Sequence, residues 1–550
     1  MKNSGRFIFL FLFFSVIHAQ ERPNILLMMT DDVGMEWFGC YGNAKKLTPH
    51  LDQLAETGVR FEHCYSQPIC TPSRVKIMTG RYGFRNYRGF GHLPKSEITF
   101  ANLLQDVGYK TCVVGKWQLA EYPSKNVKGG KGMIPLEAGF EEHSCWSLND
   151  RGNRYWDPLI ETNGEIKKHN GAYGPDVVSD FAMDFMTRNK DVPFFCYYPM
   201  ILTHSPHVPT PDSIDPNSKD EQQNLEDMVQ YTDKIVGKLV THLKNLGIYE
   251  NTLILFTSDN GTSQSIEAEM IDGRVLKGGK GSMQDKGTHV PLIAHWNQAV
   301  QENAVVQDLV DFSDFLPTFV EVAGAKIPAD RVIDGYSFAP QLKGLEGKVR
   351  DWAYCNYWYA GRTKKGERHW VRNHRYKLYE NGDFFNVLED RDENSPIEEG
   401  SSVEFVQTQF NKLQKVFENF DHKIDLTIDY SKQKLYRNQW KKSRNQILSQ
   451  MPENKRIQEL IARVQELNKQ KLELAKRNSK LSGDNEKKLL KFIQSKKFNK
   501  NTEVEELNAR IDAANDEIDS VCIEKSPEFK KLHDLLKNFS GLGKEGVGDA

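Results

Sequence analysis

Residues 23–32 read Pro-Asn-Ile-Leu-Leu-Met-Met-Thr-Asp-Asp, a short apolar run that ends in two carboxylates. The run Asn24–Met29 predicts a buried strand, and from Pro23 to about Ala325 such runs alternate with longer segments whose apolar residues recur at helical spacing. This alternation is typical of an α/β domain, a large and mostly parallel sheet with helices on both faces. The other expected strands are Thr111–Val114, Pro193–Tyr198 and Thr252–Thr257, and the clearest helices are Pro49–Thr57 and Leu225–Leu246.

The chain changes character after about Lys326. Aromatic-rich pieces are separated by Gly and Asn-Gly turns, including Asn381-Gly382 between Tyr379 and Phe384. This pattern predicts a small antiparallel sheet. We therefore expect the main α/β domain over residues 20–325 and a small C-terminal antiparallel-sheet subdomain over residues 326–400.

Residues 401–550 are rich in Lys, Glu, Asn and Gln and predict a helical extension. Two stretches carry apolar residues at heptad spacing, which favours two amphipathic helices, enough for a helical hairpin packed on itself or on a partner. We expect them to form an oligomer or to pack against the main domain. The alternative is a solvated helical appendage with no function of its own. The heptad residues are Ile457, Leu460, Val464, Leu467, Leu474 and Leu481, then Val504, Leu507, Ile511, Ala514, Ile518 and Val521.

The N-terminus is typical of an export signal over residues 1–19. Lys2 and Arg6 precede the apolar run Phe7–Ile17, and Ala19 offers a small residue for signal peptidase; a buried N-terminal strand or helix is the alternative. No later apolar run reaches the roughly 18 residues of a membrane span, so we expect an exported protein, periplasmic or secreted, that is not membrane-spanning. The 73 Lys and Arg nearly balance the 75 Asp and Glu, which does not favour a nucleic-acid partner.

Two polar pairs directly follow predicted strands. Asp31-Asp32 comes after Asn24–Met29, and Asp259-Asn260 comes after Thr252–Thr257. Ligands gather at the carboxyl ends of parallel strands, so these pairs are candidates for one site. Their oxygen atoms suit Ca²⁺ or Mg²⁺ rather than zinc, and the eight cysteines show no paired CxxC spacing. Taken alone, each pair is also compatible with a turn or a helix cap.

A second group of residues, Cys70-Thr71-Pro72-Ser73-Arg74, is followed by Thr79-Gly80-Arg81. Pro72 suits the first turn of a helix, which places Cys70 at a helix N-terminus, where backbone N–H groups favour an anion. By itself, this pattern also fits a disulfide partner or a lone reactive thiol.

With its neighbours, this stretch resembles the signature of the formylglycine-dependent sulfatases, within the alkaline phosphatase superfamily. The resemblance extends from Asn24 to about Asp390 in the family's order. The further matching motifs are Asn24–Asp32, Gly115-Lys116-Trp117, Thr203-His204-Ser205-Pro206, Thr257–Gly261, and Lys280-Gly281-Ser282 with Asp285 and Val290-Pro291.

The resemblance implies a chemistry for each motif. A maturase would oxidise Cys70 to formylglycine (3-oxoalanine), whose hydrated aldehyde supplies a nucleophile. The metal ligands would be Asp31, Asp32, residue 70, Asp259 and Asn260, with Ca²⁺ expected from the family and Mg²⁺ possible. Arg74 would hold the hydrated aldehyde. Lys116 and Lys280 would clamp the sulfate and the leaving oxygen, and His204 would protonate the departing alcohol. Without the motifs, both lysines are compatible with ordinary surface positions.

Three positions near these motifs remain open. Gln118 stands where many family members have His; glutamine can hydrogen-bond but cannot act as a base, so we expect a positioning residue. His207, three residues after His204, is either a substrate contact or structural. Lys286 stands where the family often has Gly, and it either adds charge at the pocket rim or faces solvent.

The substrate expected from the resemblance is a sulfate ester, most plausibly on a carbohydrate. An aromatic and polar set either stacks on sugar or belongs to the core. The alternative functions are phosphonate or phosphodiester hydrolysis and a degenerate sulfatase-like binding protein. The set consists of Trp146, Asn149, Arg151, Tyr155, Trp156, Trp358, His369 and Trp370.

Overall fold

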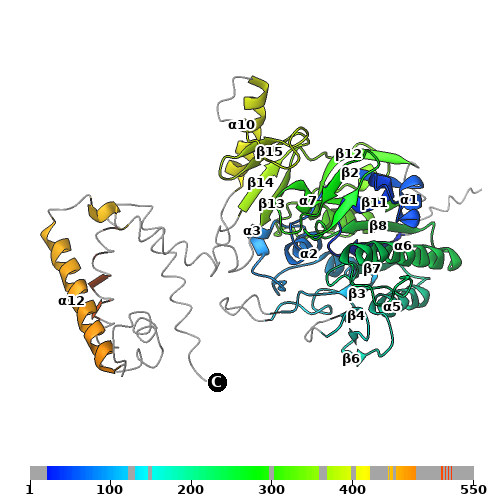
Figure 1. Cartoon of the computed structure of the whole chain (residues 1–550), viewed down its shortest axis with the longest axis horizontal. Helices are drawn as coiled ribbons and strands as arrows, with labels where there is room; N and C mark the ends of the chain where they lie inside the picture. The colour runs from blue at the N-terminus through cyan, green and yellow to red at the C-terminus, as the bar shows by residue number, and fades with distance from the viewer. Residues whose placement is uncertain are drawn as a thin grey trace, which may run out of the picture. The chain divides into compact units, whose positions relative to one another are not determined.

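The structure is a computed structural model, and the chain divides into two units, Met1–Ile424 and Asp425–Ala550 (Figure 1). The predicted export signal lies outside the described residues. Within the described part of the chain, no helix is long and apolar enough to cross a membrane. The structure describes residues 22–121, 131–146, 152–296, 303–357, 368–397, 404–420, 444, 446–449, 454–478, 510, 511, 514, 515, 518 and 522.

The first unit contains a ten-stranded sheet in the order β12-β2-β11-β8-β1-β7-β3-β4-β5-β6. The five central strands, from β8 to β4, are parallel, and β12 is parallel to β2; β11, β5 and β6 run antiparallel to their neighbours. This confirms the mostly parallel sheet. The strands are β1 Asn24–Thr30, β2 Val59–Tyr65, β3 Lys110–Lys116, β4 Glu142–Trp146, β5 Leu159–Thr162, β6 Glu165–Lys168, β7 Phe194–Pro199, β8 Thr252–Ser258, β11 His289–His295 and β12 Ala304–Asp311.

Helices cover both faces of this sheet. Successive residues of β1 enter two different cores, Ile25 on one face and Leu26 on the other, because side chains alternate along a strand. Helices α2, α4 and α8 pack over the first core, and α1, α5 and α6 over the second. These helices are α1 Pro49–Glu56, α2 Cys70–Thr79, α4 Phe100–Gln105, α5 Gly174–Arg188, α6 Glu221–Asn245 and α8 Phe315–Ala323.

Shorter elements connect these layers. The short helices are η1 Met35–Trp37, η2 Gly39–Tyr41, α3 Gly83–Asn86, α7 Asp285–Thr288, η3 Phe312–Asp314 and α9 Ala339–Leu342, and a two-stranded ribbon consists of β9 Glu267–Glu269 and β10 Val275–Lys277.

A four-stranded antiparallel sheet follows, in the order β13-β14-β15-β16, and confirms the small C-terminal sheet. Gly382 of the predicted Asn-Gly turn has φ +94°, a conformation that glycine adopts without strain. Helix α10, Glu404–Asn419, packs Leu413 and Phe417 into the core of this sheet. The strands are β13 Ala353–Tyr357, β14 Arg368–Arg372, β15 Tyr376–Tyr379 and β16 Phe384–Asn386.

In the second unit, helix α12 spans Lys455–Asn478, where the first heptad stretch predicts a helix. Most of the second stretch lies outside the described residues, although residues 510, 511, 514, 515, 518 and 522 are helical. Leu460 of α12 is in one apolar cluster with Ile518 and Cys522. The two stretches therefore pack against each other within this unit.

Candidate active site

The predicted site residues converge where the central strands of the large sheet end. Asp31 and Asp32 follow β1, Asp259 and Asn260 follow the neighbouring β8, and Lys116 is the last residue of β3. The backbone N–H of Asp32 donates to Asp259 Oδ1 at 3.1 Å, and Asn260 Nδ2 donates to Asp32 Oδ1 at 2.8 Å. The two pairs, 227 residues apart in sequence, thus form one buried cluster, as the parallel topology predicts.

This cluster has the properties of a cation site. Asp31 Oδ1 and Asn260 Oδ1 are buried and accept no hydrogen bond from any described residue, although buried oxygens are nearly always paired. Ligand atoms of Asp31, Cys70 and Asp259 lie within 4.8 Å of one another. Carboxylate and amide oxygens are the ligands that Ca²⁺ and Mg²⁺ prefer, so these residues fit such an ion.

Three cationic side chains surround the carboxylates. Lys116 Nζ lies 2.6 Å from Asp31 Oδ2, Arg74 Nη2 lies 2.8 Å from Asp259 Oδ2, and Lys280 pairs with Asp32. Burial alone would raise the pKa of Asp31, but Lys116 and the cations beside it hold that pKa well below its usual value. For Asp259, burial and the neighbouring Asp31 raise the pKa to about 7.

Cys70 is the first residue of α2, a helix whose ten residues are all buried. Its Sγ donates to Gln118 Oε1 at 3.3 Å, and Gln118 has φ +53° in the left-handed region. Burial raises the pKa of the Cys70 thiol, which opposes the interpretation of Cys70 as a reactive thiolate. Arg74, one turn along the helix, also donates from Nη1 to the carbonyl of Lys116 at 3.0 Å and so ties α2 to β3.

His204 faces the same cluster. Its Nδ1 lies 2.7 Å from the carbonyl of Ser205, and because a carbonyl only accepts, Nδ1 carries the proton. Its Nε2 lies 3.2 Å from Lys280 Nζ and 3.5 Å from Asp32 Oδ2. Burial, partly offset by Asp32, lowers the pKa of His204 to about 4.

His207 and Lys286 lie differently. His207 is 6% exposed, and neither ring nitrogen finds a hydrogen-bond partner among the described residues. Lys286 Nζ pairs with the exposed Asp392 at 3.2 Å, so its ammonium is directed at a surface carboxylate.

The aromatic and polar set, for which the sequence leaves both sugar stacking and a core position open, is mostly core. Trp146, Tyr155 and Trp370 are buried, whereas Trp156 is 40% exposed. The sequence does not predict the contacts of Tyr155, whose hydroxyl donates to the carbonyls of Ile201 and His204 and so supports the His204 loop. No local signal marks this contact. Asn149, Arg151 and Trp358 of this set lie outside the described residues.

The stretch of chain that builds this site matches proteins of known activity. Residues 23–325 match the family model Sulfatase, and residues 279–421 match N-sulphoglucosamine sulphohydrolase, C-terminal. The steryl-sulfatase of Homo sapiens is 30% identical over 441 residues, which cover 63% of this chain and 75% of the relative. The N-acetylgalactosamine-6-sulfatase of Rattus norvegicus is 31% identical over 381 residues, covering 63% and 70%. The crystal structure of Ps i-CgsB aligns with a TM-score of 0.61 at 28% identity, covering 72% of this chain and 93% of that one.

Proposed function

The chain belongs to the sulfatase family of the alkaline phosphatase superfamily and is a sulfuric ester hydrolase, and from this premise we propose that it cleaves sulfate esters of carbohydrates through a formylglycine formed from Cys70. The observation that supports this most is the position of Cys70. It starts a buried helix next to Lys116, Arg74 and Lys280. A sulfate ester is an anion that repels nucleophiles, and these cations would neutralise the charge at sulfur.

In this proposal each side chain of the cluster has a defined task. Lys116 and Lys280 bind the sulfate oxygens, and Arg74 together with Gln118 orients the nucleophile at position 70. A formylglycine at this position would supply the hydroxyl of its hydrated aldehyde as the nucleophile toward sulfur. The departing alcohol takes a proton from His204, whose Nε2 faces the cluster; the negative charge of a bound sulfate favours the imidazolium form. Lys280, whose Nζ lies 3.2 Å from His204 Nε2, would also contact this leaving oxygen.

The unpartnered oxygens of Asp31 and Asn260, with Asp32 and Asp259, would hold Ca²⁺ or Mg²⁺. Such an ion supplies Lewis-acid stabilisation of charge on the sulfate oxygens.

A carbohydrate is the substrate class that we infer for this chain. The names of two relatives specify a sterol and N-acetylgalactosamine, and Ps i-CgsB has also been solved in complex with k-i-k-neocarrahexaose. We also propose export and the action of a formylglycine-generating maturase, on the basis of the apolar segment 7–17 and of the signature at Cys70.

Two alternatives differ in what they require of the site. A phosphonate or phosphodiester hydrolase would use the same residues, so matched sulfate and phosphate esters separate it from a sulfatase. A degenerate binding protein has no need for Cys70, Arg74, Lys116, His204 and Lys280 in one cluster. Gln118 is the departure from the family pattern that gives this second alternative its weight.

Mass spectrometry of the tryptic peptide Phe61–Arg74 tests the proposal. The protein is made with a formylglycine-generating system and then assayed on 4-nitrophenyl sulfate and on oligosaccharides of carrageenan, chondroitin sulfate and heparan sulfate. We expect an aldehyde at residue 70, located by fragmentation because Cys64 is in the same peptide, and release of sulfate. Unmodified thiols, despite a maturase proven on a control protein, would reject the mechanism.

A further inference from the structure

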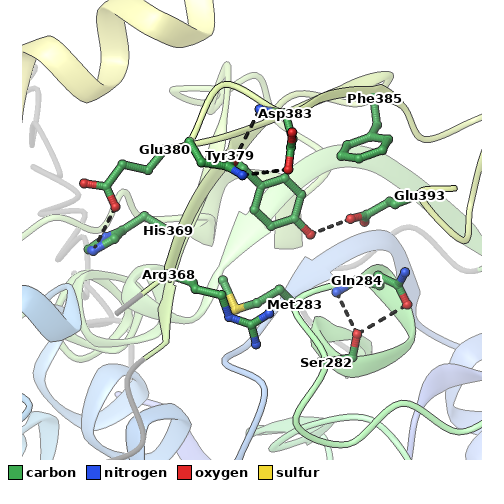
Figure 2. A pocket seen from close by; sticks show the side chains of 11 residues that line it. Ser282, Met283, Gln284, Arg368, His369, Tyr379, Glu380, Asp383, Phe385 and Glu393 are labelled. Carbon is green, nitrogen blue, oxygen red and sulfur yellow. Dashed lines mark hydrogen bonds and ion pairs between the residues drawn. The ribbon is translucent and has the colours of Figure 1, made fainter. Parts of the chain in front are cut away.

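A pocket of about 640 Å³ lies between the loop that follows Lys280 and the small antiparallel sheet. In Figure 2, Ser282 and Gln284 lie below the ring of Tyr379, and Arg368 and His369 of β14 lie to the left of that ring. Its size is within the range of about 300–1,000 Å³ that is usual for sites that bind small molecules. None of the residues assigned above to catalysis lines it.

The pocket begins beside the catalytic cluster. Ser282 is two residues after Lys280, and the intervening Gly281 donates its N–H to the carbonyl of Pro68 at 2.8 Å. Met283 packs in one apolar cluster with Ile69, the residue before Cys70. A substrate whose sulfate lies at Cys70 and Lys280 therefore has the next part of its structure within reach of this pocket.

The far wall of the pocket is held in place by buried contacts. Tyr379 donates its hydroxyl to Glu393, which pairs with the fully buried Lys377 at 2.6 Å. Lys377 also donates to the carbonyl of Met283 at 2.7 Å and so ties the sheet to the loop. The ring of Phe385 stands edge-on to Tyr379 at 5.9 Å between centroids. These contacts fix the aromatic surface before any ligand binds.

The pocket offers a hydrogen-bond donor and an acceptor with capacity left for a ligand. The guanidinium of Arg368 forms no hydrogen bond or ion pair with another described residue, and its nearest recorded contact is the Tyr357 ring at 5.9 Å. The carboxylate of Glu380 is 56% exposed and pairs with His369 at 3.6 Å. In Figure 2 no dashed line reaches the Arg368 guanidinium. The guanidinium of Arg368 and the half-exposed carboxylate of Glu380, a planar donor and an acceptor, thus line the same space.

The chemistry of the lining decides between classes of ligand. A sterol requires an apolar pocket. Here a bound sterol would remove water from Arg368, Glu380 and Asp383 without replacing the lost hydrogen bonds, which is unfavourable. A second anionic group would meet Glu380 and Asp383, because carboxylates outnumber cations in the lining. A neutral sugar ring satisfies both kinds of polar group with its hydroxyls and lays its C–H face on the fixed aromatic rings.

We propose that this pocket is the subsite for a neutral sugar unit joined to the sulfated one, and that Arg368 and Glu380 determine specificity by binding its hydroxyls. The inference rests on the proposed function and narrows its substrate to an oligosaccharide. Sequence similarity alone does not distinguish a sterol from a sugar substrate, because the similar proteins include a steryl-sulfatase and an N-acetylgalactosamine-6-sulfatase.

Comparison of two substrates tests the subsite in the mature, full-length protein. One is 4-nitrophenyl sulfate, and the other is whichever carrageenan, chondroitin sulfate or heparan sulfate oligosaccharide the wild type desulfates fastest. We expect Arg368→Ala to lower the ratio of kcat/KM for the oligosaccharide to that for the aryl sulfate about tenfold, since a hydrogen bond to a charged group is lost. Glu380→Gln should lower it less, because the amide still accepts one hydrogen bond.

Arg375→Ala and Glu389→Gln are matched controls, because this exposed pair joins at 2.5 Å on the same small sheet and lines no part of the pocket. We expect them to leave the ratio at the wild-type value. The subsite would be overturned if the wild type hydrolysed no oligosaccharide faster than the aryl sulfate, or if the ratio for Arg368→Ala equalled that of the controls. A preference for chondroitin or heparan sulfate over carrageenan would overturn the neutral sugar, because a uronate adjoins the sulfated unit in both. Absence of sulfate release from every substrate would instead overturn the proposed function.

Discussion

Gln118 is the residue at which this chain departs most from the sulfatase pattern, and its backbone and side chain both indicate a constrained position. It has φ +53°, and its Oε1 accepts from Cys70 Sγ at 3.3 Å. Non-glycine residues held at positive φ cluster at functional sites. We therefore infer that Gln118 orients the residue at position 70.

We predict that Gln118→Leu lowers kcat about tenfold and leaves KM within about twofold, because one hydrogen bond to the nucleophile is lost while sulfate binding persists. Steady-state kinetics on 4-nitrophenyl sulfate measures both parameters. Gln118→Asn is the matched variant, since asparagine tolerates positive φ but its amide is one methylene short. Wild-type kcat in Gln118→Leu would contradict a positioning role.

Substrates with different leaving groups distinguish the roles of His204 and His207. We predict that His204→Ala lowers kcat/KM by about 10²–10⁴-fold for a sugar sulfate, whose alcohol needs a proton, and by less for 4-nitrophenyl sulfate, whose phenolate leaves unprotonated. His207→Ala should affect the two substrates equally, because no catalytic contact of its ring is recorded within the described part of the chain. Equal losses for both substrates in His204→Ala would exclude His204 as the acid.

At the scale of elements, helix α2 joins the two sheets of the first unit through a buried ion pair. Lys76 Nζ lies 2.8 Å from Asp311 at the end of β12 and donates to the carbonyl of Tyr354 in β13 at 2.7 Å. Lys76 and Asp311 are both almost fully buried. Removing one member of such a pair leaves the other charged and desolvated.

We predict that Lys76→Met lowers the free energy of unfolding by about 3–5 kcal/mol, measured by denaturant titration. Adding Asp311→Asn should recover part of the loss, because the unpaired carboxylate is removed. Lys95→Met breaks the exposed pair with Glu137 and should change stability by about 1 kcal/mol or less. A loss in Lys76→Met no larger than in Lys95→Met would show that the pair does not hold the sheets together.

Three histidines from different elements meet beside the large sheet and give it a pH dependence. His63 of β2 is 4.9 Å from His374 and 5.9 Å from His289 between ring centroids, with Arg372 and Asp285 nearby. Burial, followed by the charges of His289, His374 and Arg372, lowers the pKa of His63 to about 3. Between pH 3 and about 6.5 the unfolded chain thus binds more protons at this residue, and stability falls as the pH falls.

We predict that His63→Phe, which keeps an aromatic ring in the cluster, reduces the drop in Tm between pH 7 and pH 5. Differential scanning fluorimetry at unit steps of pH measures the slope. At pH 7, where His63 is neutral, the variant and the wild type should differ least. An unchanged slope would mean that His63 does not contribute to acid sensitivity.

The residues of the catalytic cluster could be predicted from the sequence more readily than those of the neighbouring pocket and loops, for a physical reason. Asp31 and Asp259 follow predicted strands, and the parallel pairing of β1 and β8 brings the ends of those strands together. Lys116 is predicted from the resemblance of its motif to that of the sulfatases, and β3 ends at the same edge of the sheet. Arg368 and Tyr155 depend on contacts distant in sequence. Tertiary packing decides whether an aromatic residue such as Trp370 is buried or exposed. The local sequence pattern is the same in both cases and therefore does not predict its burial.

At the scale of the whole molecule, each of the two units contains its own apolar core. All strands of the large and small sheets, with α10, belong to residues up to Ile424. In the second unit, Leu460 of α12 is buried in a cluster with Ile518 and Cys522. A domain that contains its own hydrophobic core can in principle fold alone.

We predict that a chain of residues 20–424 retains hydrolysis of 4-nitrophenyl sulfate and that residues 425–550, expressed alone, are helical and unfold cooperatively. Circular dichroism follows the second unit, and Leu460→Asp there should abolish its cooperative transition, because a charge cannot be buried in this small core without a partner. Light scattering of the whole chain and of residues 20–424 compares their masses, and a larger assembly for the whole chain alone would assign the heptads to oligomer formation. An isolated second unit without helical signal would show instead that its helices depend on the rest of the chain, and the prediction of two independent units would then be wrong.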